Sequence, residues 1–413
     1  MPDWTKSMKQ TYEYYIVDPG TWKDMKKVDV IKSNSIKRDS EVETRGSASF
    51  EVTEKLPECY IRTYLVTVQN GVTEKHVLGT HLVQTPSSKF NGRIANTTLD
   101  GYTSLLELKE NQPPIGFFVP KTTKEDPVNV MEQAYMIIRD NARAPVIKTE
   151  CPSEVTHEFI ADPGDTWITY VSDLVELQVY EDTRNSNKTR ITKYQLDVDE
   201  LGQIMFVPVQ DVAVMQPVWT YTDDNSSILY PDISMEHDLY GIPNVVEIKY
   251  TSGNSVYYAR VENNDPNSPL STVSRGRRIS YRLDTPSIGL GSSEPETTTK
   301  SMVFEYARQL LESLSSLHCR VTYTHGYCPV RVGDCVRLNY SRAGITDVKA
   351  KVISQDIKCV PGCPVSETAE FYVNLLPNKI KFTNEKGELV DKYGRLVDEN
   401  GDVIPDNEEE VGA

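Results

Sequence analysis

Residues 61–68 read Ile61-Arg62-Thr63-Tyr64-Leu65-Val66-Thr67-Val68, and Asn70-Gly71 follows after one glutamine. β-Branched and aromatic residues dominate this run, and such residues fit the pleated, half-buried surface of a strand. An Asn-Gly pair favours the tight turn of a β-hairpin because both residues adopt positive φ at low cost. The stretch therefore predicts a strand that turns back on itself, and it indicates a chain that is mainly β.

The neighbouring sequence continues this pattern. Short runs at Gly79–Val83 and Arg93–Leu99 have strand character, and a turn of helix is expected at Leu105–Leu108. Strands this short and regular are typical of small barrels or sandwiches. We therefore predict a first, tube-like β-barrel domain over residues 1–120.

Residues 121–230 predict a mixed α/β insert, because helical periodicity alternates there with strand-like runs. The expected elements are a helix capped by Asp126 with Pro127 at its first position, a second helix beginning at Asp165 or Thr166, a strand at Leu177–Tyr180, and a hairpin of Gln195–Val198 with Gln203–Val207.

Residues 231–376 predict a second β-barrel domain, with strands at Val245–Tyr250 and Ser255–Arg260. A helix is expected at 300–317. Its apolar face would carry Met302, Tyr306, Leu310, Leu314 and Leu317, widened by Val303, Ala307 and Leu311. The predicted fold class is α+β, mainly β. It comprises two small β-barrel domains, the mixed insert and a short β-repeat C-terminal tail.

The tail, residues 377–413, repeats a glycine every seven residues at Gly387, Gly394 and Gly401. Each glycine is followed by an apolar pair: Leu389-Val390, Leu396-Val397 and Val403-Ile404. A glycine in each heptad costs about 1 kcal/mol of helix, so a turn followed by a short strand is favoured over a coiled coil. Three such units cannot cover their apolar pairs alone, and we expect the tail to lie against other protein.

Charge leaves two interpretations of this tail open. Residues 385–413 hold ten Asp and Glu against three Lys and Arg, a net of −7. The tail is then either an ordered, spike-like or partner-binding segment, or a solvated acidic segment without fixed structure.

Composition restricts the class of protein. The 413 residues are 38% hydrophobic and 25% charged, with no run long enough to span a bilayer and no apolar core for a signal peptide. We expect a protein made in the cytoplasm that stays soluble. The net charge of −16 argues against wrapping nucleic acid, but an acidic conduit would let DNA slide without sticking.

Five of the seven cysteines fall between residues 319 and 363, with His318 and His325 nearby. The paired Cys-x2-Cys spacing of structural zinc sites does not occur, so we favour free or packed thiols and predict no metal and no cofactor. The sequence Asn264-Asp265-Pro266-Asn267-Ser268-Pro269 is typical of a turn, although its oxygens suit calcium.

The sequence contains no zinc-protease, phosphate-loop or nucleophile-elbow motif. Cys328 lies three residues after His325, and we interpret this spacing as structural rather than as a thiol and its base. Asp197, Asp199 and Glu200 fall at a predicted turn, where we expect solvated carboxylates. We predict no catalytic residues, and therefore a protein that is not an enzyme.

Arg275-Gly276-Arg277-Arg278 is the one compact basic segment of the sequence. Two interpretations remain open: a solvated loop, or a partner for an acidic segment such as the tail of another subunit.

Several stretches together resemble bacteriophage tail baseplate hub (tail tip hub) proteins. They are Asp18-Pro19-Gly20-Thr21-Trp22, Ser33-Asn34-Ser35-Ile36-Lys37-Arg38-Asp39, Pro231-Asp232-Ile233-Ser234, Asp238-Leu239-Tyr240-Gly241-Ile242-Pro243-Asn244-Val245-Val246, Ser274-Arg275-Gly276-Arg277-Arg278-Ile279 and Tyr327-Cys328-Pro329-Val330-Arg331-Val332-Gly333-Asp334-Cys335-Val336. The resemblance covers roughly residues 10–376.

The resemblance implies a homotrimer in which each subunit carries two similar barrels, so that a threefold hub meets a sixfold tail tube. It implies further partners: the tail tube or a distal tail protein, and a central spike, fibre or tape-measure protein. The expected location is the virion tail tip, made in the host cytoplasm and without membrane, through which DNA passes without specific binding. The alternatives are a tail-associated cell-wall hydrolase, as many relatives carry, and a receptor-binding module suggested by the 23 tyrosines.

Overall fold

The chain is mainly β, as the computed structural model shows for residues 2–30, 34–90, 95–176, 180–182, 190–252, 254–286 and 295–404. The predicted fold class, α+β with mostly strands, is confirmed. The chain divides into two compact units: a first unit of Met1–Ser234 and Val321–Glu370, and a second unit of Met235–Arg320 and Phe371–Ala413. The four-part division expected from the sequence stays a prediction.

One large sheet dominates the first unit. Its strands are β1 (Lys9–Val17), β2 (Asp24–Val28), β3 (Ser35–Asp39), β4 (Gly46–Val52), β5 (Cys59–Gln69), β6 (Val72–Phe90), β7 (Ala95–Tyr102), β15 (Trp219–Thr222), β16 (Leu229–Asp238), β20 (Ser316–Gly326), β21 (Cys335–Tyr340), β22 (Ile345–Lys358) and β23 (Pro364–Asn374). They follow the order β16-β20-β23-β22-β3-β4-β7-β6-β5-β1-β2, and β21 joins β15 to β22. A short 3₁₀ turn, Ser341–Ala343, links β21 to β22.

The hairpin predicted at residues 61–71 is present as β5 and β6. Gln69 pairs with Val72 across the Asn70-Gly71 turn, where both residues have positive φ (52° and 79°). Ile61 and Leu65 are completely buried in one apolar core with Phe50 of β4 and Leu78 of β6. The alternation of the sequence thus fixes which face of this hairpin enters the core.

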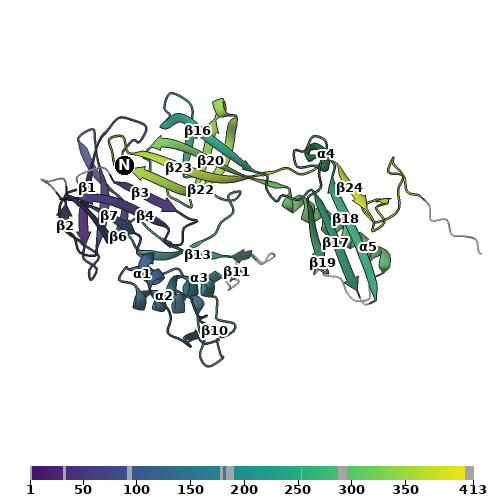
Figure 1. The fold of residues 1–413 in the computed structure, drawn as a ribbon, viewed down its shortest axis with the longest axis horizontal. Coiled ribbons are helices and arrows are strands. Elements are labelled where there is room, and N and C mark those ends of the chain that lie inside the picture. The colour runs from purple at the N-terminus through teal and green to yellow at the C-terminus, as the bar shows by residue number, and fades with distance from the viewer. Residues whose placement is uncertain are drawn as a thin grey trace, which may run out of the picture. The chain divides into compact units, whose positions relative to one another are not determined.

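The sheets in the described part of the chain are open, so the two closed barrels that we expected are not formed. β3 pairs with β4 of the N-terminal strands and also with β22, where Ile36 lies opposite Ile357. To close the N-terminal strands into a barrel, β3 would have to pair with another of these strands. It pairs with β22 instead and so joins the N-terminal strands to the strands of residues 219–374 (Figure 1). Sequence periodicity identifies strands but does not specify this long-range pairing.

Helices and small sheets of the first unit form a second apolar core. They are α1 (Leu105–Glu110), α2 (Val130–Asn141), α3 (Trp167–Glu176), β8 (Phe118–Val119) with β10 (Phe159–Ile160), and β9 (Val146–Ile147) with β13 (Tyr194–Val198) and β14 (Ile204–Pro208). The first unit also has the strand pair β11 (Tyr180–Asp182) and β12 (Arg190–Thr192). Figure 1 shows the three helices gathered beside β13. Their contact is apolar because Ile138, Tyr170 and Leu174 are completely buried against Leu196 and Phe206 of the hairpin.

In the second unit, helix α5 (Glu296–Leu314) packs on one face of a five-stranded sheet (Figure 1). The strands are β17 (Val245–Ser252), β18 (Ser255–Asn263), β19 (Ser280–Asp284), β24 (Ile380–Thr383) and β25 (Leu389–Val390), in the order β19-β17-β18-β24-β25. A four-residue helix, α4 (Thr272–Arg275), connects β18 to β19. None of the helices in the described ranges has the apolar run that a bilayer crossing requires.

The predicted helices are present, with two corrections. α2 is capped by Asn129, whose side chain accepts from the N–H of Glu132, and not by Asp126. α5 ends at Leu314, and Leu317 belongs to β20. Val303, Ala307 and Leu311 of the predicted stripe are buried in the core of the second unit, and Tyr306, Leu310 and Leu314 pack against that core, whereas Met302 is 36% exposed. In the predicted strand Leu177–Tyr180, residues 177–179 lie outside the described residues.

The glycine-repeat tail is described as far as Ile404, and each repeat turns at its glycine, with φ of 80°, 80° and 91°. Narrow hairpins follow, with Val390 opposite Leu396 and Val397 opposite Val403. The apolar pairs are covered unequally. Val390 is buried against α5, but Val403 and Ile404 of the last repeat are each 47% exposed. The chain's own helix therefore covers the first repeat, and the last remains open.

Candidate functional site

The turn of the β13–β14 hairpin, Asp199-Glu200-Leu201-Gly202, is bound to the large sheet; we call it the docked turn. Its carbonyl oxygens accept hydrogen bonds from four side chains of the N-terminal strands and α1: Trp22 Nε1 (2.7 Å), Arg62 Nη2 (3.2 Å), Thr80 Oγ1 (3.0 Å) and Ser104 Oγ (2.9 Å). A turn in water would leave these carbonyls solvated, so the four donors fix the position of the insert on the sheet.

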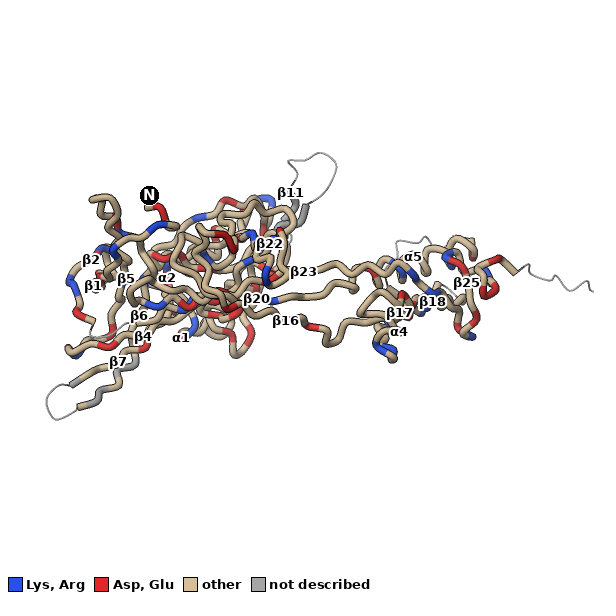
Figure 2. The backbone as a smooth tube through the Cα atoms, turned by 90° about the horizontal axis from the view of Figure 1, so that it is seen from above, with Lys and Arg blue, Asp and Glu red and all other residues tan. Residues whose placement is uncertain are grey.

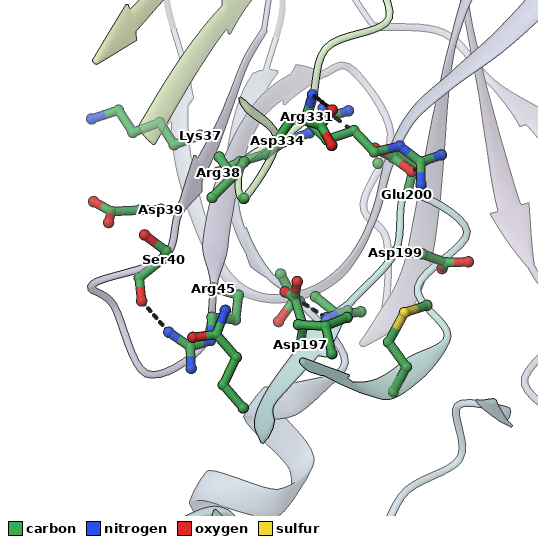
Figure 3. Close-up of a pocket in the computed structure, with 18 of the residues that line it drawn as sticks. Lys37, Arg38, Asp39, Ser40, Arg45, Asp197, Asp199, Glu200, Arg331 and Asp334 are labelled. Atoms are coloured by element: carbon green, nitrogen blue, oxygen red, sulfur yellow. Dashed lines mark hydrogen bonds and ion pairs between the residues drawn. The ribbon is translucent and has the colours of Figure 1, made fainter. Parts of the chain in front are cut away.

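Two arginines hold the side chain of Glu200. Arg38 Nη1 lies 3.4 Å from Glu200 Oε1, and Arg331 Nη2 lies 2.7 Å from Oε2 (Figure 3). The Glu200 side chain is 12% exposed. Our prediction of a solvated carboxylate was therefore wrong for Glu200, because a predicted turn does not show what the turn lies against.

A cavity of about 280 Å³ lies beside the docked turn. Its charged lining is balanced: Lys37, Arg38, Arg45, Arg331 and Lys351 face Asp39, Asp197, Asp199, Glu200 and Asp334. The charged side chains labelled in Figure 3 come from β3, the turn before β4, the β13–β14 hairpin and the loop before β21, and Lys351 belongs to β22. Such a balance favours neither an anion nor a cation, and it suits a polar junction between elements.

Burial shifts the pKa of several groups at this cavity. It raises the pKa of Asp197 and of Asp334. Burial, together with the nearby positive charge of Arg38, lowers the pKa of His81 to about 3, so that ring is neutral at neutral pH. The lining hydroxyls of Ser40, Thr80 and Thr103 donate to backbone carbonyl oxygens, those of Ile353, Glu200 and Thr44.

A second polar cluster is completely buried among β15, β20, β22 and β23. The carboxylate of Glu367 accepts from Tyr323 Oη (2.6 Å), Gln355 Nε2 (2.6 Å) and Tyr221 Oη (3.2 Å), and His325 Nε2 lies 3.4 Å away. Both Glu367 and His325 are 0% exposed. A buried carboxylate needs such partners, because its desolvation is otherwise very costly.

Charge complementarity keeps this pair ionised. Burial alone would lower the pKa of His325, but its contacts with Cys328 and Glu367 raise it to about 10. Burial alone would raise the pKa of Glu367, yet hydrogen bonding and charge from His325, with Tyr323 and Gln355, hold it below its usual value. The cluster is therefore an ion pair at neutral pH.

Cys328 and His325 do meet, with Sγ 3.8 Å from Nδ1, as part of this cluster. Cys328 is 1% exposed and His325 is 0% exposed, so neither reaches a substrate from solvent. The Nδ1 atom of His325 is 2.7 Å from the carbonyl O of Gly326, which orients the ring. The structural interpretation of this pair stays a prediction.

The cluster and the docked turn are connected by one hydrogen-bonded path. Gln355 donates to Glu367 and accepts from Arg38 Nη1 (3.1 Å), and Arg38 pairs with Glu200. The path crosses β23, β22 and β3 before it reaches the hairpin. The Arg38 guanidinium is thus shared by the sheet and the insert, and Lys would not make both contacts.

The other candidates have simple structural roles. All seven cysteines are free thiols, and no group of three or more His, Cys, Asp or Glu side chains in the described ranges is arranged to hold a metal ion. Asp265, of the possible calcium turn, accepts from the backbone N–H groups of Asn267 (2.9 Å) and Asn378 (3.0 Å). These bonds hold the pKa of Asp265 below its usual value.

Sequence reasoning missed Glu367, Gln355 and Arg38 as one network. Alternation is the only signal: Glu367 occupies an inward position of β23, between the buried Val365 and Ala369. An acid at an apolar position of a strand indicates a buried partner, which the sequence alone does not identify.

Comparison with solved structures finds two tail proteins that match over nearly their whole length. The tail protein of Neisseria meningitidis MC58 has a TM-score of 0.54 and 11% identity, over 89% of this chain and 99% of that one. The 43 kDa tail protein of prophage MuSo2 from Shewanella oneidensis also has a TM-score of 0.54 and 11% identity, over 87% of this chain and 98% of that one. The chain therefore has the fold of phage tail proteins, and the resemblance stated from sequence is confirmed.

No protein-family model and no curated protein matches the sequence. At 11% identity the likeness establishes the fold, while function has to be argued from the chain itself.

Proposed function

We propose that this chain is a structural component of a phage tail tip, a homotrimeric hub that links a sixfold tail tube to a threefold central spike or fibre. The observation that carries the proposal is the likeness to two tail proteins over almost the entire length of both chains. A match of this extent includes both units and the insert, so it describes a shared architecture rather than one common motif.

Two features of the chain support a role in assembly rather than catalysis. Two carboxylates of the first unit have structural partners: Glu200 holds the insert on the sheet, and Glu367 is bound inside the sheet. The large sheet ends in β2, whose outer edge has no partner strand among the described residues and whose Met25 is 67% exposed. Edge strands leave backbone N–H and C=O groups available for a neighbouring copy.

In the assembled tail the hub would contact the tail tube or a distal tail protein on one side and a spike, fibre or tape-measure protein on the other. Its net charge of −16 suits a channel through which DNA passes without binding. The particle component would be made in the host cytoplasm and would reside in the virion.

Imaging of intact tails tests this proposal, together with light scattering of the purified full chain. We expect copies in a multiple of three on the tail axis and a trimeric mass in solution. A stable monomer at micromolar concentration, or density away from the central axis, would overturn the hub. Clearing of a cell-wall gel by the chain alone would instead favour the hydrolase alternative.

A further inference from the structure

The second unit carries a compact basic segment in a chain that is otherwise acidic. Helix α4 ends at Arg275, and Gly276 turns the chain with φ 62° into Arg277 and Arg278. The Arg275 guanidinium donates to the carbonyl oxygens of Ile242 (3.0 Å) and Leu239 (3.3 Å), which ties α4 to that segment. The arginines are therefore held at fixed positions rather than on a loose loop.

Two of the three arginines are incompletely neutralised. Arg278 pairs with Glu262 at 3.3 Å but remains 57% exposed. Arg277 is exposed and has no acidic partner among the described residues. Positive charge thus remains available to another molecule at this point of the surface.

Apolar side chains accompany these arginines. Leu239 is 45% exposed, Tyr240 is 93% exposed and Val273 of α4 is 58% exposed. Together with Arg275, Arg277 and Arg278 we call them the α4 patch. Exposed Tyr and Arg beside aliphatic groups are typical of protein–protein interfaces, where such residues dominate the binding energy.

The end of the same chain has the complementary composition. Residues 398–413 contain seven Asp and Glu and no Lys or Arg. Within this segment Val403 and Ile404 are each 47% exposed, and four of the acids fall in residues 405–413, beyond the described residues. An apolar pair followed by carboxylates fits a patch that offers apolar groups beside arginines.

The relative positions of the two features favour contact between copies. In Figure 1 the yellow end of the chain leaves the second unit away from α4, and Figure 2 shows α4 and β25 apart, with Lys and Arg at α4 and Asp and Glu around β25. A contact of this kind joins two different surfaces of identical chains. Such head-to-tail contacts close into rings when the rotation is right, and three copies would satisfy each patch once.

We propose that residues 398–413 of one copy bind the α4 patch of a neighbouring copy. This contact rests on the proposed homotrimer and names the surfaces through which the second units join. Because its charges lie at the surface, the contact weakens with salt, over a screening length of about 8 Å at physiological ionic strength.

A photocrosslinking experiment on the full-length chain tests which copy supplies the tail. Val273 is replaced by p-benzoylphenylalanine in a ¹⁴N preparation, which is mixed with ¹⁵N wild-type chain, irradiated and digested. We expect crosslinked peptides that join ¹⁴N position 273 to ¹⁵N residues 398–413. The same replacement at Ile115 of the first unit, an exposed apolar residue, is the matched control and should not capture this peptide.

Charge reversal then tests the chemistry. Arg277→Glu with Arg278→Glu, and separately Glu408→Arg with Glu409→Arg and Glu410→Arg, should each reduce the crosslink yield by about 10-fold, and their combination should restore it. Arg139→Glu with Lys148→Glu, on exposed residues of α2 and the segment after β9, controls for net charge.

Light scattering on the same samples separates the two proposals. A trimer whose crosslinks avoid residues 398–413, join only chains of one isotope, or survive charge reversal would overturn the tail contact and leave the hub intact. A monomer would overturn both.

Discussion

The sheets of the two units differ in whether their ion pairs are buried or exposed. In the first unit, Glu367 is buried inside the sheet and Glu200 is nearly buried against it, each held by side chains distant in sequence. In the second unit, the core between α5 and the sheet is apolar, and Glu247 pairs with Arg260 and Arg282 on the other face of the sheet. The sheet of the first unit thus contains a buried ion pair, whereas the core under α5 in the second unit is apolar and the buried Asp265 of that unit lies in the loop between β18 and α4.

This difference predicts where substitutions will be costly. A buried polar group that loses its partner leaves an uncompensated charge or donor, whereas a surface ion pair loses little to solvent. Replacing a glutamate should therefore lower the free energy of unfolding more where its carboxylate is buried, as in the first unit, than where it is exposed, as in the second.

The largest effect is expected for Glu367→Ala. The substitution removes the counter-charge of the buried His325 ring and the carboxylate that accepts from the hydroxyls of Tyr221 and Tyr323, which should lower the free energy of unfolding of the first unit by about 3–5 kcal/mol. Urea unfolding with hydrogen exchange on first-unit peptides measures it. Glu367→Gln, which keeps an acceptor, is the control and should lose less; a loss under about 1 kcal/mol for the alanine variant would contradict a buried ion pair.

The same pair predicts a pH dependence. The pKa of His325 rises from 6.5 to about 10 on folding, so its contribution is fully present below pH 6.5 and is lost as the pH rises through about 10. The pKa of Glu367 is lowered on folding from 4.5, so its contribution is present above that value and is lost as the pH falls below it. The difference in free energy of unfolding between wild type and Glu367→Gln should be largest between pH 4.5 and pH 6.5, where both contributions are present. A difference that stays constant from neutral pH to pH 10 would contradict the assignment.

A smaller effect is expected for Glu200→Gln, which removes the charge shared by Arg38 and Arg331. We expect the free energy of unfolding to fall by about 1–3 kcal/mol, because the contacts of Glu200 with the two arginines are only partly exposed. Hydrogen exchange of residues 199–208 should increase before that of the sheet, since the docked turn is released first. Glu132→Gln, on an exposed pair of α2, is the matched control; equal effects at both positions would mean that the turn is not held by this charge.

Gly202 and Gly116 have nearly the same φ, so alanine variants at the two positions distinguish the cost of backbone strain from the cost of a steric clash. Gly202 of the docked turn has φ +81°, and an added Cβ would lie 3.0 Å from Thr80 and from Trp22. Gly116 has φ +82° with nothing within 4 Å. Both alanine variants carry the conformational cost, but Gly202→Ala should lose about 1–2 kcal/mol more, because the turn must move off the sheet. Thermal unfolding of the two variants side by side gives this difference, and equal midpoints would show that the turn is loosely held.

The sequence predicts the features that depend on residues close together in the chain and does not predict those that join distant residues. The β5–β6 hairpin, the β13–β14 hairpin and the glycine turns depend on neighbouring residues, and all were predicted from local pattern. The pairing of β3 with β22 and the path from Glu367 through Gln355 to Arg38 join residues far apart in the chain. A single sequence carries no signal for such partners, so the open sheet and the docked turn could not be predicted.

The tail shows the same limit from the other direction. We expected its apolar pairs to need other protein, and for Val390 the cover is α5 of the same chain. The heptad spacing of the glycines predicts turns and short strands but does not identify the surface that they cover. Val403 and Ile404 remain exposed in the described residues, so the original expectation applies to the last repeat.

The smallest effect is expected for Glu247→Gln, and it sharpens the comparison between the units. Glu247 Oε2 lies 2.6 Å from Arg282 Nε, and Oε1 lies 3.5 Å from Arg260 Nε. These distances are similar to those between Glu200 and its two arginines. The Arg282 side chain is, however, 76% exposed, so water already solvates the pair and the loss should stay below about 1 kcal/mol. Urea unfolding of second-unit peptides at low and high salt measures the change, and the small loss should vanish as salt increases. If Glu247→Gln were as costly as Glu200→Gln, distance rather than burial would set the strength of these ion pairs, and the contrast between the two units would fail.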